Sequence, residues 1–380
     1  MSFLDPWSET EQNRHSDQLK RFVYQNAEEK RAGSLPHVVK QLPKQRTVQG
    51  FDSPHQTGDH LAYDLLTRAP LYQMTSHFTE VAPQAPVRGV HRHVSAPSLF
   101  CMRGKGWEMN DGRTFEFESY DLLVIPPYTV HQHGGDRDLG CEIYVPEAFR
   151  TDHLLGIAGR EQHKLSEKPV FPAGTEPLYD GDKLIGYRIK KGVLGINEDI
   201  EVILGPEPSR EATFQARQQA GSWSLPVENT YDRYIKLLHD EVDFCRKVDH
   251  VVLDRKEPWE WTLQGKIKWL VHPEMEIAAN EMWIYFQEIP PASRSGKHRH
   301  VSEELLLVLE GRGYDTHDGQ RWEWEQGDLI CIPPMSEHQH FCVGENRALL
   351  LSAMPSIYAD FGLGGFEQIE VAPEYAEKDK

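Results

Sequence analysis

Two stretches decide the fold, GVHRHVS at residues 89–95 and GKHRHVS at residues 296–302. They are separated by 207 positions, and the same offset relates a series of later features without a gap. These features are Gly104 and Gly311, Gly106 and Gly313, Asp111-Gly112 and Asp318-Gly319, Asp121-Leu122 and Asp328-Leu329, Pro126-Pro127 and Pro333-Pro334, and His131-Gln132-His133 and His338-Gln339-His340. Chance does not readily produce such a register, so the chain contains a duplicated unit.

Each unit has the pattern of short β-strands. TFEFESYDLLVIPP (114–127) and RWEWEQGDLICIPP (321–334) alternate aromatic and charged residues and then become continuously apolar. Gly-x-Gly, Asp-Gly and Pro-Pro pairs separate the strands as turns. The sequence therefore predicts a fold dominated by β-structure, with two jelly-roll barrels in one chain and a few peripheral helices.

The repeat also suggests a domain organisation. Asn229 and Thr230 can cap a helix between the two units, and a weaker helix is expected over residues 16–29. We expect an amino-terminal helical or extended arm (1–60), an amino-terminal barrel (61–150), a connector with strands and a helix (151–262), a carboxy-terminal barrel (263–365) and a tail (366–380).

Composition narrows the classes of partner. The 380 residues carry a formal net charge of −18, which repels nucleic acids and anionic membrane surfaces. The first residues lack the basic start and apolar run of a signal peptide, and no apolar stretch is long enough to span a bilayer. The five cysteines form no C-x-x-C pair and are expected to be reduced thiols. We therefore expect a cytoplasmic protein that acts on a small molecule.

The repeated histidines are the main functional signal. Side chains two positions apart on a strand point to the same side, so each histidine pair faces one side of its strand. Imidazole clusters suit Fe, Mn, Cu, Ni or Zn, and four such pairs placed identically in two repeats predict metal sites. The pairs are His91 and His93, His131 and His133, His298 and His300, and His338 and His340.

The second repeat resembles the cupin superfamily. HRHVSEELLLVLEGRG (298–313) and GDLICIPPMSEHQH (327–340) are similar to its two motifs, which supply three histidines and one glutamate to a metal inside a β-barrel. Met335 stands where the second motif normally has glycine, which leaves the ligands unchanged. The resemblance implies that the metal ligands of this barrel are His298, His300, Glu304 and His338.

The first repeat departs from this pattern at one ligand. In HRHVSAPSLFCMRGKG (91–106), Pro97 occupies the place of the glutamate, so the resemblance leaves His91, His93 and His131 as ligands. This three-histidine pattern resembles the bicupin gentisate, salicylate and 1-hydroxy-2-naphthoate dioxygenases. That resemblance implies a non-heme Fe(II) enzyme, with Mn, Ni, Cu or Zn as alternatives, that inserts O2 into an aromatic or phenolic substrate. It also implies a homodimer or homotetramer.

Those dioxygenases carry an arginine shortly after the first histidine pair, where it holds the substrate carboxylate. Leu99 takes that place here, and Arg103 is the nearest basic residue on the same nominal face of the strand. A phenolic substrate without a carboxylate is therefore favoured.

Other roles stay open at this stage. His133 and His340 are candidates for catalytic proton transfer or for hydrogen bonding to the ligands, and the alternative is that they fill the barrel mouth. Glu303 should face out of its barrel as a solvated or structural charge. A non-oxidative cupin enzyme (a decarboxylase, isomerase or lyase) and a non-enzymatic small-molecule-binding bicupin are the alternative functions. The sequence does not decide which barrel is catalytic.

Overall fold

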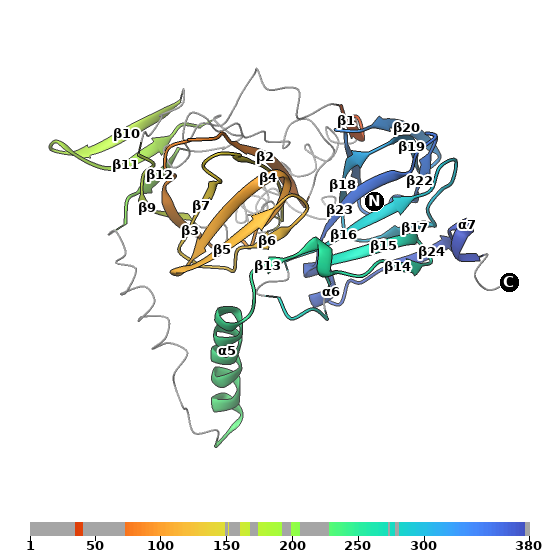
Figure 1. Ribbon diagram of the computed structural model, residues 1–380. Helices are drawn as coiled ribbons and strands as arrows, with labels where there is room; N and C mark the ends of the chain where they lie inside the picture. The colour runs from red at the N-terminus through yellow and green to blue at the C-terminus, as the bar shows by residue number, and fades with distance from the viewer. Residues whose placement is uncertain are drawn as a thin grey trace, which may run out of the picture.

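Two β-barrels lie side by side in the computed structural model of the chain (Figure 1). The expected helix over 16–29 lies outside the residues that the structure describes. Within the described part of the chain, no helix combines the length and the apolar character needed to cross a membrane. The structure describes residues 35–40, 73–148, 151, 160–167, 174–191, 199–205, 228–272, 274–277 and 281–376.

The amino-terminal barrel is antiparallel. Strand β4 is long enough to pair with four other strands, so it joins the two halves of the barrel wall. Its strands are β2 (Thr75–Val81), β3 (Val90–His93), β4 (Ser98–Asn110), β5 (Arg113–Glu118), β6 (Leu122–Val124), β7 (His131–Gly135) and β8 (Cys141–Glu147).

The carboxy-terminal barrel consists of a seven-stranded and a five-stranded sheet. Its strands are β15 (Gly265–Val271), β16 (Met282–Ile289), β17 (Lys297–His300), β18 (Glu304–Glu310), β19 (Arg312–His317), β20 (Gln320–Glu325), β21 (Leu329–Ile332), β22 (His338–Cys342) and β23 (Ala348–Pro355), with β14 (Glu260–Thr262) added at one edge.

The remaining elements extend or connect the barrels. Strands β9 (Arg160–Lys164) and β24 (Phe366–Glu370) pair with β3 and β17. The others are β1 (Val38–Val39), a separate sheet of β10 (Thr175–Asp180), β11 (Lys183–Ile189) and β12 (Ile200–Ile203), helix α5 (Thr230–Lys247), β13 (Val251–Val252), a 3-10 turn (Asp254–Lys256), α6 (Ile357–Asp360) and α7 (Pro373–Ala376).

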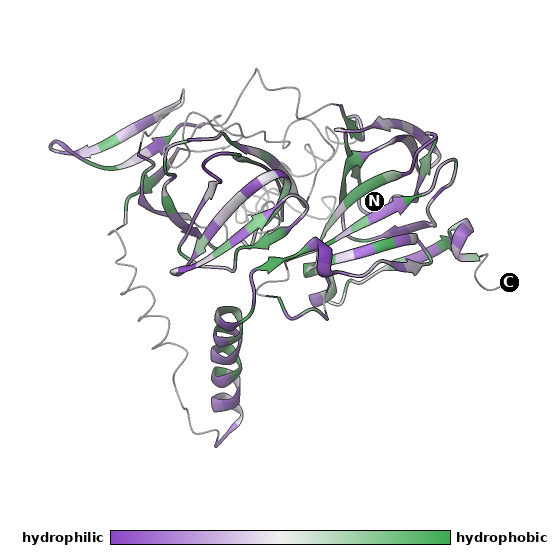
Figure 2. Cartoon of the chain, viewed as in Figure 1, coloured by the Kyte–Doolittle hydropathy of each residue, from purple (hydrophilic) through white to green (hydrophobic). Residues whose placement is uncertain are grey.

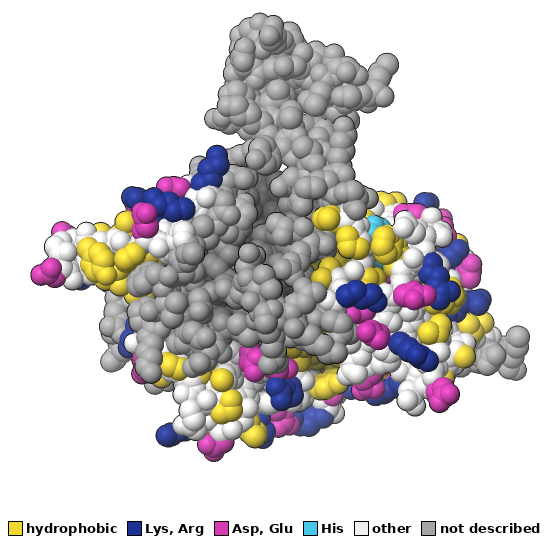
Figure 3. Space-filling model, turned by 90° about the horizontal axis from the view of Figure 1, so that it is seen from above, with side chains coloured by type: hydrophobic (Ala, Val, Ile, Leu, Met, Phe, Trp, Pro, Cys, Tyr) yellow, Lys and Arg dark blue, Asp and Glu magenta, His cyan; other side chains and the backbone are white. Residues whose placement is uncertain are grey.

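The sequence prediction of two β-barrels with few helices is confirmed. The expected helix is α5, whose first turn is capped by the Asn229 side chain accepting from the amide of Asp232 at 3.0 Å. The repeated glycines occupy equivalent turns, because Gly104 and Gly311 have φ of +88° and +89°, a region that favours glycine. Figure 2 shows apolar stretches along the barrel strands, and on the face in Figure 3 acidic and basic side chains are mixed.

An apolar interface joins the two barrels. The largest buried cluster draws residues from both, and the rings of Phe100 and Phe286 meet across it with centroids 5.7 Å apart. Glu303 faces out of its barrel as expected, but it is buried rather than solvated. Its carboxylate accepts from the main-chain amides of Gln73 and Met74, at 3.3 and 3.1 Å. The structural alternative for this residue is therefore the one that the structure supports.

Each barrel also receives an edge strand from the segment that precedes the other barrel. Strand β1, which precedes the amino-terminal barrel, pairs with β21 of the carboxy-terminal barrel. Strand β13, which precedes the carboxy-terminal barrel, pairs with β6 of the amino-terminal barrel. The partners are equivalent in the repeat, since Val38 faces Ile330 and Val251 faces Leu123. The two halves of the chain therefore interlock.

The same tripeptide makes both exchanged strands. His37 and His250 each precede two valines, and the main-chain oxygens of the two histidines accept from the amides of Cys331 and Val124 at 2.7 and 2.8 Å. The ring of His37 stacks on Trp322 and the ring of His250 on Phe115, with centroids 4.7 and 4.6 Å apart. The duplicated unit therefore includes this arm, at a different sequence offset from the barrels.

Because β1 and β13 each pair with the opposite barrel, a mutation in either strand should loosen the barrel with which that strand pairs. Val39 and Val252 are equivalent and buried, so Val39→Asp and Val252→Asp each place an unpaired charge in the interior and lower the free energy of unfolding by more than about 3 kcal/mol. Hydrogen exchange should increase first at β21 in the Val39 variant and at β6 in the Val252 variant. Loosening of β6 by the Val39 variant would contradict the exchanged pairing.

Candidate metal centres

The carboxy-terminal barrel brings together the four residues that the resemblance assigns to its metal. His298 and His300 lie on β17, and Glu304 and His338 begin β18 and β22. One donor atom from each lies within 4.8 Å of the others, and all four side chains are buried. Nε2 of His338 is 3.1 Å from Nε2 of His298 and 3.5 Å from Oε2 of Glu304. Donors about 2 Å from a shared cation have such separations.

Main-chain carbonyls determine which ring nitrogen carries the proton. Nδ1 of His300 lies 2.6 Å from the carbonyl oxygen of Ser302, and Nδ1 of His338 lies 2.9 Å from that of Ser336. A carbonyl can only accept, so in each neutral ring Nδ1 is protonated and Nε2 presents a lone pair to the cluster. Lone pairs and a carboxylate repel one another unless a cation lies among them. The donor set therefore fits a divalent metal ion.

The protonation states agree with this reading. Burial lowers the pKa of His338 to about 4, and it also holds the pKa of His298 well below its usual value, with the charge of His338 adding to the effect. Burial opposes ionisation of Glu304, but its interactions with the adjacent His300 and His338 rings outweigh burial and hold the pKa of this carboxyl well below its usual range. Near pH 7 the cluster therefore contains a carboxylate beside the neutral imidazoles of His298 and His338.

Two hydroxyl groups orient the glutamate. The Tyr285 hydroxyl donates to Oε1 of Glu304 at 2.9 Å, and the Ser352 hydroxyl donates to the same oxygen. Burial, followed by the nearby Glu304 charge, raises the pKa of Tyr285 well above its usual value, so this phenol remains a donor. Oε2 is thereby directed toward Nε2 of His300 and of His338.

His340, a predicted catalytic residue, is held against the barrel wall. Its Nδ1 lies 2.8 Å from Oδ2 of Asp315, whose Oδ1 accepts from the Trp324 indole at 2.6 Å. Burial opposes a charge on His340, but Asp315 outweighs it and raises the pKa of the imidazole. Oδ2 of Asp315 is also 3.3 Å from Nε2 of His317, and Nδ1 of His317 is 2.7 Å from Nδ1 of His37. A hydrogen-bonded chain thus links strand β1 and the preceding His37 to His340, two residues after the predicted ligand His338.

The amino-terminal barrel assembles the three predicted ligands in the same way. His91 and His93 lie on β3 and His131 begins β7, with one nitrogen of each within 4.8 Å of the others. Nδ1 of His93 lies 2.8 Å from the Ser95 carbonyl, and Nδ1 of His131 lies 2.9 Å from the Thr129 carbonyl. Nε2 of both rings therefore faces the cluster, as in the other barrel. This donor set also fits a divalent metal ion.

His133, the other predicted catalytic residue, lies beside a carboxylate that the sequence analysis missed. Glu108 on β4 is its direct cross-strand partner, and Oε2 of Glu108 is 3.5 Å from Nδ1 of His133. Glu108, His131 and His133 form a second group with donor atoms within 4.8 Å of one another. Burial raises the pKa of Glu108 well above its usual value, although the Arg88 charge opposes the shift. Glu108 could have been identified from the sequence, because the 207-residue repeat aligns it with Asp315, another acidic residue.

The arginines near the amino-terminal histidine cluster do not lie where the sequence suggested a carboxylate-binding residue. Arg103 points away from the histidines, because its side chain is 71% exposed and its Nη2 lies 2.6 Å from Oε1 of Glu142. Leu99, which takes the place of the clamp arginine, belongs to an apolar cluster. Arg88, three residues before His91, is instead the buried basic side chain of this barrel, at 3% exposure.

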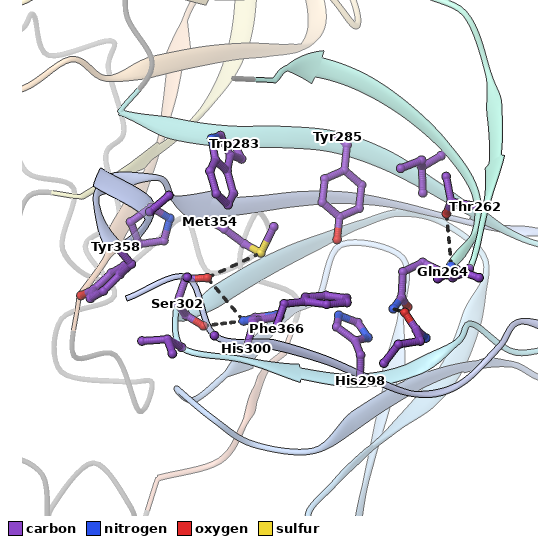
Figure 4. A pocket seen from close by; sticks show the side chains of 18 of the residues that line it. Thr262, Gln264, Trp283, Tyr285, His298, His300, Ser302, Met354, Tyr358 and Phe366 are labelled. Carbon is purple, nitrogen blue, oxygen red and sulfur yellow. Dashed lines mark hydrogen bonds between the residues drawn. The ribbon is translucent and has the colours of Figure 1, made fainter. Parts of the chain in front are cut away.

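A pocket of about 410 Å³ opens onto the carboxy-terminal cluster. His298 and His300 form part of its lining, and Figure 4 shows Trp283 and Tyr285 on the opposite wall, with the ring of Phe366 beside His298. The centroids of Phe366 and His298 are 5.3 Å apart. An aromatic molecule can therefore stack within reach of the metal-facing nitrogens.

The profile of the cupin domain family matches residues 285–354, which include most of this barrel. An uncharacterized protein of Methanocaldococcus jannaschii is 31% identical over 94 residues, which are 24% of this chain and 74% of that protein. The chain belongs to the cupin family. Because two such barrels occur in one chain, it is a bicupin.

The bicupin is also similar to aromatic dioxygenases. The 5-aminosalicylate 1,2-dioxygenase of Comamonas sp. is 22% identical over 291 residues, or 73% of this chain, which spans just under two thirds (65%) of that enzyme. A structure of salicylate 1,2-dioxygenase from Pseudoaminobacter salicylatoxidans with gentisate superposes with a TM-score of 0.55 at 16% identity, covering 88% of this chain and 85% of the other. The resemblance stated from the sequence is confirmed, and the bicupin is related to dioxygenases of aromatic compounds.

The wall network around Asp315 predicts unequal roles for two neighbouring tryptophans. Trp324→Phe removes the indole donor to a buried carboxylate, whereas the indole nitrogen of Trp322 has no hydrogen-bond partner among the described residues. We expect Trp324→Phe to lower the free energy of unfolding by about 2 kcal/mol more than Trp322→Phe, measured by denaturant titration. Equal effects of the two changes would show that the indole–carboxylate bond contributes nothing.

Proposed function

We propose that this bicupin is a non-heme Fe(II) dioxygenase that inserts O2 into an aromatic or phenolic substrate. The observation that carries the proposal is the convergence of unprotonated histidine nitrogens at the wall of an aromatic pocket. The relationship to 5-aminosalicylate and salicylate dioxygenases supports the same class of reaction.

The pocket favours a planar, uncharged substrate. Neither lysine nor arginine is among the described residues that line it, so a substrate carboxylate would find no cationic partner there. Its polar groups include the amides of Gln264 and Gln368 and the hydroxyl of Ser302. A phenol without a carboxylate therefore fits this pocket better than a benzoate.

The residues of the chain bind and orient the reactants. The rings of Trp283 and Phe366 supply stacking surfaces, and His298 and His300 would hold the metal at the pocket wall, where a phenol oxygen can reach it. Tyr285 and Ser352 hold Glu304 so that one oxygen stays directed at that position. The chemistry that Fe(II) supplies when bound is Lewis acidity toward the phenol oxygen and electron transfer to O2.

An oxygen electrode tests the reaction class. Iron-loaded protein with a panel of phenols, with and without carboxylates, should consume O2, and the phenols without carboxylates should give the higher kcat/KM. Metal chelation and His298→Ala should abolish the uptake. Turnover of a panel member under nitrogen, without O2 uptake in air, would instead establish a non-oxidative cupin enzyme.

The two clusters predict two metal ions per chain. His91→Ala and His298→Ala should each remove about one equivalent of bound metal, because each cluster loses one of its own donors. Elemental analysis of dialysed protein measures this, and His239→Ala on α5 is the matched control outside both clusters. Loss of all metal from either single variant would leave only one genuine site.

The stacking surface predicts an effect on substrate binding. Phe366→Ala should raise KM by roughly 5- to 10-fold with a smaller change in kcat, because a stacking contact of about 1 kcal/mol forms before the chemical step. Phe361→Ala, a change of similar exposure outside the pocket lining, should leave KM unchanged. Equal KM values for the two variants would place the substrate elsewhere.

A further inference from the structure

Glu108 and Asp315 occupy the same position in the two barrels. Each lies opposite the histidine that follows the last ligand by two residues, since Glu108 faces His133 and Asp315 faces His340. The side chains are fully buried in both cases. The repeat therefore provides an internal comparison of what a carboxylate does at this place.

In the carboxy-terminal barrel, side chains of the barrel wall provide the hydrogen-bond partners of the Asp315 carboxylate. Asp315 accepts from the Trp324 indole at 2.6 Å, and its Oδ2 lies 2.8 Å from His340 and 3.3 Å from His317. All of these partners belong to β19, β20 and β22. Asp315 is thus held away from the metal cluster as a structural carboxylate.

In the amino-terminal barrel the contacts equivalent to those of Trp324 and His317 are absent, and the contact to the histidine is longer. Phe117 takes the place of Trp324 and has no N–H group. Asn110 takes the place of His317, and its amide instead meets Nδ1 of His250 at 3.0 Å. His133 lies 3.5 Å from the carboxylate, and among the described residues neither oxygen of Glu108 has a hydrogen-bond partner. A fully buried carboxyl group of this kind is ionised only beside a cation and is otherwise protonated.

The predicted metal position of the amino-terminal barrel lies next to Glu108. A carboxylate oxygen of Glu108 lies within 4.8 Å of donor nitrogens of His131 and His133, and His131 also belongs to the three-histidine cluster. Glutamate reaches one methylene further into the barrel than aspartate. The same barrel lacks the motif glutamate, because Pro97 occupies its place.

We propose that Glu108 is the carboxylate ligand of the amino-terminal metal centre and replaces, from the opposite strand, the glutamate that Pro97 excludes. This inference rests on the proposed metal site of that barrel. It gives both centres one carboxylate, supplied by β18 in one barrel and by β4 in the other.

The competing role for Glu108 is that of a counter-ion to Arg88. Arg88 is buried in the same barrel, and its positive charge acts on Glu108. The two roles make different predictions, because a counter-ion affects stability through Arg88, whereas a ligand affects metal affinity. The position of Arg88 in the repeat is taken by Ser295 in the other barrel, where no such pair exists.

Cobalt(II) binding to the full chain distinguishes the two roles. In a His298→Ala background, which isolates the amino-terminal centre, Glu108→Gln should weaken Co(II) binding by roughly 10- to 100-fold and alter the visible Co(II) spectrum. Calorimetric titration measures the affinity. Glu116→Gln, the same change at an exposed position on β5, should stay within about twofold of the parent.

Three results would overturn an assignment. Unchanged Co(II) affinity in Glu108→Gln, with a lowered Tm that Arg88→Met restores, would make Glu108 a counter-ion. If Glu108→Gln does not fold, Glu108→Asp keeps the charge beside Arg88 but shortens its reach, and unchanged affinity there would equally refute the ligand role. Failure of the His298→Ala parent to bind Co(II) would refute the amino-terminal centre itself.

Discussion

The contact on which both centres depend is the hydrogen bond from a histidine Nδ1 to a main-chain carbonyl two residues away. It occurs at His93 and His300 with the carbonyls of Ser95 and Ser302, and equivalently at the first histidine of β7 and of β22. Each bond is local, so it forms as soon as the strand and its adjoining turn are folded. The backbone thereby directs four Nε2 lone pairs into the barrels before any cation binds, and the sites are preorganised.

The exchanged arms connect this local geometry to the whole chain. Strand β1 pairs with the carboxy-terminal barrel and places His37 against His317, which is linked through Asp315 to His340. The opposite arm places His250 against Asn110 in the other barrel. A hydrogen-bonded chain from the other half of the sequence therefore reaches His340 in the carboxy-terminal barrel, and each barrel takes one edge strand from the other half.

The repeated histidines could be read from the sequence because their spacing, alternation and motif context are local properties. Glu108 and Arg88 could not be recognised in that way, since their meaning depends on which side chains β4 and β7 bring together across the barrel. Strands β1 and β13 could not be recognised from the barrel repeat, because they are 213 positions apart and the equivalent barrel residues are 207 apart. No local sequence pattern indicates which barrel a strand will join. Glu303 was expected to face out of its barrel. It does so, but it is buried, because the other barrel packs against this face.

Charge balance explains why the two barrels differ where the sequence repeats. In the carboxy-terminal barrel Glu304 would offset part of the charge of a divalent ion bound there, and Asp315 pairs separately with His340 in the wall. In the amino-terminal barrel Pro97 removes the first carboxylate, while Arg88 adds a buried positive charge. Without an anion, three neutral imidazoles, a divalent ion and a guanidinium would share one low-dielectric interior, at a cost of several kcal/mol. Glu108, at the wall position of the repeat, is the buried carboxyl group beside His131 and His133 that can balance these charges.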